Sequence, residues 1–355
     1  MGPGLWVFQA ISSAIPYVNL MFLNIAQAVL AVFLASDFLK RDCKFDTTEV
    51  VYTRSMTNWE YVAGKTVGIL FVFLVLNVAV LLVAAVFNIF FADVPFMPVP
   101  YLTYPLIISL PTLVFILGLS FLLMVLIKNQ GVTFIILLGY IGVILFYLGG
   151  RLHQLPDYTA WRLPLLYSDF TGYANLGQIL IHRGVYLLLG LGFIFLTVLI
   201  IKRLPQSRVM MNVSRVLAVV TLVGGLVLGM VYIGGVKAER TLRQKVLALN
   251  DKWANSPEFT ITSCDINLRH LGDRIAGSAG MTVENESGEG VETLVFSLNP
   301  GLRVTGVTSA GEEIEFEREL QILRIRLPRP LKKGGNYRLA VSYRGTIDET
   351  ACYPD

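Results

Sequence analysis

The sequence predicts a polytopic α-helical membrane domain of about six spans, followed by a C-terminal, extracytoplasmic antiparallel β-sandwich. Three observations lead to this fold class. The chain of 355 residues is 54% hydrophobic and only 15% charged, whereas soluble domains carry about a quarter charged residues. Long apolar runs recur through its first 235 residues. Short runs that alternate between apolar and polar residues follow after residue 258.

Six apolar runs are long enough to span a bilayer, because a transmembrane helix needs about 17–25 residues. The runs occupy residues 16–36, 67–90, 105–127, 131–149, 184–201 and 214–235. Residues 1–235 are therefore predicted to form a transmembrane domain. A secretory signal peptide is not indicated, because the chain begins with Met1-Gly2-Pro3-Gly4 and has no basic residue near its start.

Lys and Arg are unevenly distributed among the segments that connect these runs. Residues 37–66, 128–130 and 202–213 all contain them, and these segments lie on one side if every run spans. The positive-inside rule makes that side the cytoplasm and puts the N-terminus and everything after residue 235 outside. A first span that begins outside suggests a further helix upstream. The first span could begin outside because the sequence starts at a fragment boundary, because it starts at an alternative start codon, or because this is the genuine start of the chain. All three explanations stay open.

Residues 37–66 are predicted to form a structured cytoplasmic elbow between the first two spans. Thr57 and Glu60 have the spacing of a capping box, so a helix should begin near Asn58 and continue into the second span. The tripeptide Gly64-Lys65-Thr66 resembles the end of a phosphate loop, but the first glycine of that motif would stand where Trp59 is. Nucleotide binding by this segment is therefore disfavoured. A plain interfacial linker is the alternative interpretation.

Residues 236–256 are predicted to form a helical stalk, and residues 257–355 a β-sandwich. Apolar residues of the stalk recur at helical spacing on one face. They are Leu242, Val246, Leu249 and Trp253. From residue 258 the period changes to two, and turn sequences such as Asn299-Pro300-Gly301 separate the runs. This length is sufficient for one small β domain with its own core.

Two residue pairs outside the elbow are candidates for a structural role. Asp169 and Arg183 fall in or next to the 150–183 loop, where they are outer-loop gate candidates that could pair; a solvated pair would contribute little. No charged residue falls firmly within a span, which disfavours an ion-coupled transporter. Cys264 and Cys352 both follow the last span, and a disulfide between them is possible in an oxidising space.

The stretch KRDCKFDTTEVVYTRSMTNWEYVAGKTVGIL, residues 40–70, resembles the cytoplasmic loop of permease subunits of second-class ABC exporters. The resemblance implies that a coupling helix in this loop docks into a groove of a separate ABC ATPase. The residues implied for this contact are Asp46, Thr47, Glu49, Val50 and Arg54. ATP would then be bound by the partner ATPase, and this chain would bind no cofactor.

A second stretch, LPLLYSDFTGYANLGQILIHRGVYLL at residues 163–188, resembles the outer loop of a subgroup of these permeases. In that subgroup the permease is fused to an extracytoplasmic region like aminopeptidase N, a zinc gluzincin. Residues 258–347 are similar to the N-terminal β domain of such peptidases. Gluzincins need the motif His-Glu-x-x-His, and none of the three histidines of this chain has that context. No catalytic residue and no metal site are therefore expected here.

The favoured hypothesis is a permease subunit of an ATP-driven exporter in the bacterial inner membrane, without enzymatic activity of its own. Its expected partners are an ABC ATPase, the lipid bilayer and a second copy or another permease half. The modest net charge of +4 does not indicate nucleic acid. One alternative is the membrane anchor and N-terminal part of a zinc aminopeptidase-like protein whose catalytic domain lies beyond residue 355. Another is a scaffold that displays the sandwich without transporting anything.

Overall fold

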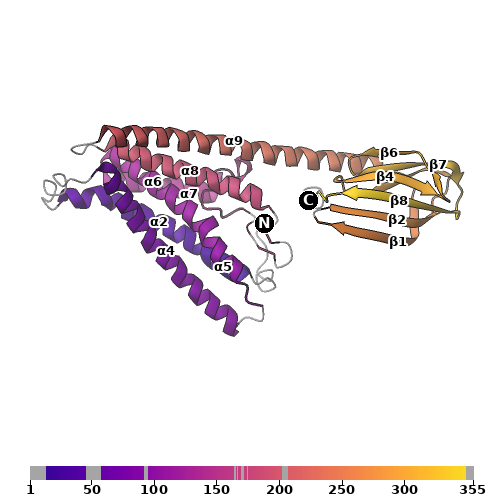
Figure 1. The fold of residues 1–355 in the computed structure, drawn as a ribbon, viewed down its shortest axis with the longest axis horizontal. Helices are drawn as coiled ribbons and strands as arrows, with labels where there is room; N and C mark the ends of the chain where they lie inside the picture. Colours follow the sequence, from indigo (N-terminus) through magenta and orange to yellow (C-terminus); the bar gives the residue numbers. More distant parts are fainter. Residues whose placement is uncertain are drawn as a thin grey trace. The chain divides into compact units, whose positions relative to one another are not determined.

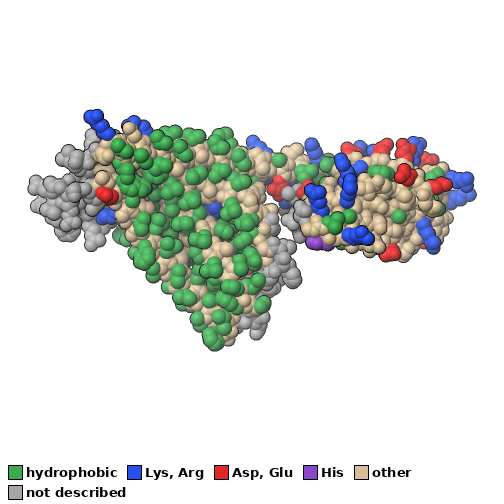
Figure 2. Space-filling view, in the orientation of Figure 1, with side chains coloured by type: hydrophobic (Ala, Val, Ile, Leu, Met, Phe, Trp, Pro, Cys, Tyr) green, Lys and Arg blue, Asp and Glu red, His purple; other side chains and the backbone are tan. Residues whose placement is uncertain are grey.

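The computed structural model describes residues 13–348 apart from 45–56, 92–94, 164, 166, 169–171, 174, 202–206 and 273. The chain divides into two compact units, Met1–Gly235 and Val236–Asp355. Figure 2 shows that hydrophobic side chains cover the visible face of the first unit, whereas charged side chains are frequent on the second. This contrast agrees with the change in composition along the sequence.

The described residues of the first unit form a bundle of long apolar helices (Figure 1). Six helical segments among the described residues are long and apolar enough to cross a membrane, which confirms that the six predicted apolar runs form helices. They are α2 (Ala14–Lys44), α4 (Asn58–Phe91), α5–η1–α6 (Pro98–Tyr104, Pro105–Ser109 and Leu110–Ile127), α7–η2 (Gln130–Val143 and Ile144–Leu148), α8 (Leu176–Ile200) and α9 (Arg208–Trp253).

Most of these helices extend beyond the predicted runs. Helix α4 begins at Asn58, the position indicated by the capping-box pattern, and α8 begins at Leu176 rather than at residue 184. Helix α9 continues without a break to Trp253, so the predicted stalk is part of the same helix as the last span. The added turns contain polar residues, which lower hydropathy but remain helical where tertiary contacts hold them.

Close packing between α6 and α8 depends on two glycines. The segment Pro98–Ile127 is the most enclosed part of the bundle, with 67% of its apolar window buried against 22% for α4. A Cβ atom added to Gly118 would lie 2.3 Å from the carbonyl oxygen of Gly190. A Cβ atom on Gly190 would lie 2.6 Å from the backbone of Phe115. Glycine therefore permits the backbones of two helices to meet directly.

Two antiparallel sheets form most of the second unit. The larger sheet has the strand order β1-β2-β8-β4-β5, and the smaller one has the order β3-β7-β6. The larger sheet consists of β1 (Phe259–Leu271), β2 (Arg274–Asn285), β8 (Asn336–Gly345), β4 (Leu302–Ser309) and β5 (Glu312–Glu313). The smaller sheet consists of β3 (Val291–Ser297), β7 (Ile322–Leu331) and β6 (Phe316–Glu319). The predicted antiparallel β region is thus confirmed.

One apolar core lies between these sheets. Val283, Val307 and Val341 from the larger sheet join Leu294 and Ile325 from the smaller one, and all five are buried. The alternation of apolar and polar residues along each strand directs one face of each sheet into this core. The smaller sheet therefore covers part of the larger one and leaves β1 exposed along its length.

The last turns of α9 pack against the strands of the second unit. The Gln321 side chain donates from Nε2 to the Val246 carbonyl at 2.7 Å and to Asn250 Oδ1 at 3.0 Å. The guanidinium of Arg324 lies over the Trp253 ring at 4.9 Å. Both Val246 and Leu249, which belong to the apolar face of the predicted stalk, are buried.

We expect Gly118→Ala to destabilise the bundle by about 1–3 kcal/mol, because the new methyl group overlaps the Gly190 carbonyl and separates the two helices. Thermal unfolding of the purified chain in detergent would measure the effect. The matched control is Gly139→Ala in α7, where an added Cβ meets no atom within 4 Å. Equal stability of the two variants would contradict a direct contact between the backbones.

Candidate functional site

An arginine buried in the helix bundle is the centre of the candidate site. Arg183, in the second turn of α8, is 2% exposed. Its Nε and Nη2 atoms donate to the carbonyl oxygens of Ile107 and Ile108, each at 2.8 Å. These carbonyls belong to the π-helical turn η1. Pro111 has no N–H to donate to the Ile107 carbonyl four residues earlier, so the arginine supplies a donor that the proline lacks.

The remaining bonds of this guanidinium also go to uncharged oxygens. Nη1 donates to the Tyr158 carbonyl at 2.8 Å, and Nη2 donates to Thr112 Oγ1 at 2.7 Å. The carboxylate of Asp157, 1% exposed, supplies a favourable negative charge to the arginine. That carboxylate itself accepts from Thr159 Oγ1 and from the Arg162 backbone N–H, each at 2.7 Å. A buried charge without such partners would be strongly unfavourable.

Residues 151–160, which we call the anchored loop, are held by side chains from four helical segments. Their backbone carbonyls accept hydrogen bonds from the bundle. The donors are Asn24 to Thr159, Thr112 and Arg183 to Tyr158, Tyr186 to Leu155, His182 to Gln154 and Tyr232 to His153. Burial raises the pKa of the Tyr158 hydroxyl, so this group stays protonated.

The anchored loop has an unusual backbone at its start. Leu152, His153 and Gln154 have φ angles of 47°, 59° and 64°, in the left-handed region. Non-glycine residues adopt this region at a cost of about 1–3 kcal/mol each, and they persist there when surrounding contacts impose it. The carbonyl acceptors described above are the contacts that impose it here. The loop therefore stores strain that its release would relieve.

A continuous chain of polar side chains extends from Arg183 into the bundle. Thr112 accepts from Asn24 at 3.2 Å, and Asn24 accepts from Gln27 at 2.9 Å. Gln27 in turn accepts from Asn77 at 2.8 Å, and Asn77 accepts from Ser109 at 2.7 Å. All five of these side chains have no exposed surface. This polar chain links α2, α4, η1, α6 and α8 by side-chain hydrogen bonds, which hold membrane helices together.

Only part of this site was predictable from the sequence. Arg183 was expected at the edge of a loop, whereas it lies inside α8 among other helices. The polar chain was missed, although the signal was visible: Asn24, Gln27 and Asn77 are amides within apolar runs. Asp169, the predicted partner of Arg183, lies outside the described residues. The pairing therefore stays a prediction.

The opposite end of the bundle fixes the start of α4 to the end of α8. Thr57 and Glu60 form reciprocal hydrogen bonds, with Thr57 N donating to Glu60 Oε2 at 2.7 Å and Glu60 N donating to Thr57 Oγ1 at 3.3 Å. Asn58 Nδ2 donates to the carbonyls of Ile201 and Val198 at 2.8 and 3.2 Å, at the C-terminal end of α8. We call this contact the Asn58 clamp. The ring of Trp59 stacks on Phe195 beside it.

Several predicted contacts fall outside the described residues. These are the proposed ATPase contacts Asp46, Thr47, Glu49, Val50 and Arg54, and Cys352 of the possible disulfide. Cys264 has an exposed side chain on β1. Among the described residues, no group of three or more His, Cys, Asp or Glu side chains is placed to hold a metal ion.

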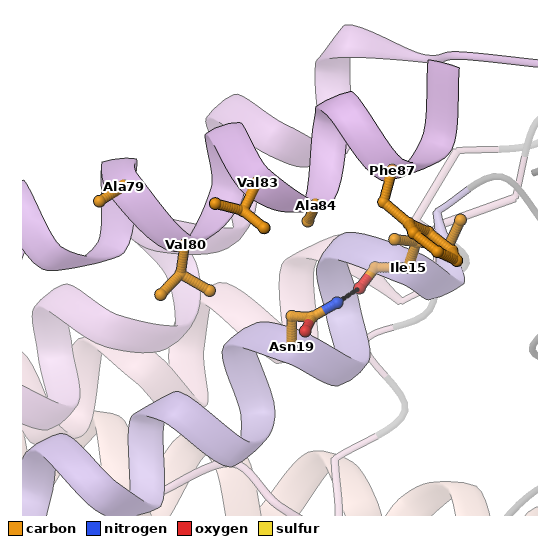
Figure 3. A pocket seen from close by; sticks show the side chains of 7 residues that line it. All are labelled: Ile15, Asn19, Ala79, Val80, Val83, Ala84 and Phe87. Atoms are coloured by element: carbon orange, nitrogen blue, oxygen red, sulfur yellow. Dashed lines mark hydrogen bonds between the residues drawn. The ribbon is translucent and has the colours of Figure 1, made fainter. Parts of the chain in front are cut away.

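An apolar groove of about 540 Å³ lies between α2 and α4. Figure 3 shows Val83 and Phe87 of α4 on one side and Ile15 and Asn19 of α2 on the other, with Asn19 Nδ2 donating to the Ile15 carbonyl at 2.8 Å. The groove is lined by Ile15, Asn19, Ala79, Val80, Val83, Ala84 and Phe87. None of these side chains is titratable. The buried arginine, and not this groove, is therefore taken as the candidate functional site.

We expect Arg183→Lys to release the anchored loop, because a single ammonium cannot reproduce four bonds of a planar fork. The loss should amount to about 3 kcal/mol, as for a broken buried polar contact. Hydrogen exchange of the backbone amides of residues 151–160 in detergent should accelerate at least tenfold. Arg151→Lys is the control, because Arg151 is exposed and lies over the Tyr147 ring. Unchanged exchange in Arg183→Lys would refute the anchoring role.

Asn58→Ala should loosen the other end of the bundle. Loss of the clamp leaves the terminal carbonyls of α8 without the Asn58 donor, which typically costs about 1–3 kcal/mol in a buried setting. Exchange should rise in residues 195–201 and stay unchanged in residues 151–160. Asn129→Ala removes only the local cap of α7, where Asn129 Oδ1 accepts from Val132 N at 3.2 Å, and should leave α8 unaffected. Equal effects of both variants on α8 would contradict the clamp.

Comparison with known proteins adds little to this geometry. No family model and no curated protein matches the chain. Among solved structures, it is similar to an M1 zinc metallopeptidase from Deinococcus radiodurans, with 27% identity and a TM-score of 0.23 over 25% of this chain and 21% of that one. It is also similar to a mutant two-domain M1 zinc metallopeptidase bound to L-tryptophan, with 26% identity and a TM-score of 0.24 over the same shares. The match thus spans about a fifth of those chains, and at these TM-scores it carries no argument about fold or activity.

Proposed function

We propose that this chain is the membrane-spanning permease subunit of an ATP-driven exporter of the ABC class. A separate ATPase would bind the elbow at residues 37–66 and hydrolyse ATP, and this chain would carry out no chemical step. The second unit would lie outside the cytoplasm and receive or hand over the substrate. The sequence resemblance of residues 40–70 supplies the transporter class, and the bundle supplies a means of coupling.

The observation that carries the proposal is the buried polar chain that ends at Arg183. A bundle that only anchors a domain needs apolar helices and gains nothing from a buried guanidinium, which is costly within a bilayer. Ionisable residues within membrane segments are rare and usually mark functional positions. Here the buried polar side chains join the helices to a strained loop, and release of that loop would give the second state that a transport cycle requires.

The path of coupling follows contacts already described. The elbow leads directly into the capping box of α4, and the Asn58 clamp joins α4 to the end of α8. Arg183 lies near the other end of α8, where it holds the anchored loop. A movement of the elbow would therefore reach the loop through one rigid helix. In this account the ATPase cycle shifts α8 along its packing against α6 and breaks the bonds of Arg183.

Association with the ATPase provides the direct test. The chain, tagged and purified from native membranes, should bring an ABC ATPase with it, and Glu49→Lys or Arg54→Glu should abolish the association by reversing a charge of the proposed contact. Lys245→Glu on the exposed side of α9 is the matched control and should bind normally. Normal association of both elbow variants with the ATPase would contradict the assignment of residues 37–66 as the ATPase contact.

The same purification distinguishes the peptidase alternative. If no ATPase is present and the intact native chain is much heavier than 39.4 kDa, the anchored-peptidase function is favoured. Peptidase activity of that longer chain, sensitive to a zinc chelator, would then be expected. A permease complex would contain the ATPase whatever the mass of this chain.

A further inference from the structure

Strand β1 is an open edge of the larger sheet. It is paired with β2 on one side, and among the described residues no strand pairs with its other side. Every side chain from Thr260 to Leu271 is exposed. Proteins usually protect such edges with short strands, Lys or Pro, because free N–H and C=O groups pair readily with another strand. β1 has 13 residues and contains neither Lys nor Pro.

The side chains of this edge have no complementary partner within their own sheet. Across the β1–β2 ladder, Asp265 stands opposite Gly280 and Arg269 stands opposite Ala276. Among the described residues, neither charged group forms an ion pair. On the other face of the strand, Ile266 and Leu268 are 59% and 52% exposed. The open edge therefore exposes two opposite charges on one face of the strand and two large apolar side chains on the other.

The sequence of β1 is complementary to itself about Asn267. An antiparallel pair of two β1 strands with Asn267 opposite Asn267 places Asp265 of each copy opposite Arg269 of the other. The same register places Ile266 opposite Leu268 on the other face. Residues directly opposite each other in an antiparallel ladder have Cβ atoms about 4.5–5.5 Å apart, close enough for both kinds of pair to form.

We propose that the β1 strands of two copies of this chain pair antiparallel about Asn267 and join their larger sheets into one continuous sheet. The pair is related by a twofold axis, so each contact occurs twice. The charge pattern selects this register, because a shift by two residues would separate the Asp265–Arg269 pairs. This interface is independent of transport and would be formed by either functional alternative.

Disulfide trapping in native membranes tests the register. Asn267→Cys in a Cys264→Ser background of the full chain should give a cross-linked dimer under mild oxidation, because opposite Cα atoms lie within the range of a disulfide. Glu312→Cys in the same background is the control, since β5 is the opposite edge of this sheet. Both variants retain Cys43 and Cys352. Absence of a dimer with Asn267→Cys, or equal trapping of the control, would overturn the proposal and favour another occupant of the edge.

Charge exchange tests the complementarity within the Asn267→Cys, Cys264→Ser background. Asp265→Arg or Arg269→Asp alone places like charges opposite each other twice and should lower the trapped fraction about threefold or more. The double exchange, Asp265→Arg with Arg269→Asp, restores both pairs and should recover the dimer. Recovery also shows that the substitutions do not unfold the sheet. A double variant that stays as low as the single ones would overturn the self-pairing.

Discussion

The structure of the bundle depends on the burial of one guanidinium. Arg183 lies in an apolar interior because its guanidinium donates four hydrogen bonds, three to backbone carbonyls and one to the hydroxyl of Thr112. A proline in α6 removes one helical donor, a π-helical turn presents two carbonyls, and a loop contributes a third. The arginine, the proline and the loop are therefore mutually dependent. Loss of the arginine would remove a donor from the Ile107 and Tyr158 carbonyls, and loss of the loop would leave one guanidinium N–H without its acceptor.

The hydrogen bonds of Arg183 depend in turn on how closely α6 and α8 pack. The direct backbone contact of Gly118 with Gly190 keeps α6 and α8 close enough for the arginine to reach its acceptors. At the other end of α8, Asn58 and Trp59 fix the helix to the residues that follow the elbow. One helix is thus held at both ends by short polar contacts, and the loop at one end stores backbone strain. In the proposed transport cycle this element would change between two arrangements rather than through a continuum, because packed interiors do not deform gradually.

Hydropathy was sufficient to predict the six spans and the β region, because both depend on the local pattern of apolar residues. The start of α4 was also predictable, since a capping box needs only Thr57 and Glu60. The position of Arg183 was not, because its burial depends on Pro111 and Tyr158, which are distant in the sequence and adjacent only in the fold. Hydropathy therefore placed a charged residue at the membrane edge. The single amides within spans were visible in the sequence, but their connection into one chain required the arrangement of five helical segments.

The most direct test is hydrogen exchange of the wild-type chain in complex with the proposed ATPase in lipid, without nucleotide and after trapping with ATP and vanadate. The backbone amides of residues 151–160 should exchange at different rates in the two states, because the proposed movement of α8 would break the bonds of Arg183. The amides near the Asn58 clamp should stay protected in both. Identical exchange of residues 151–160 in the two states, in a complex that hydrolyses ATP, would contradict the account.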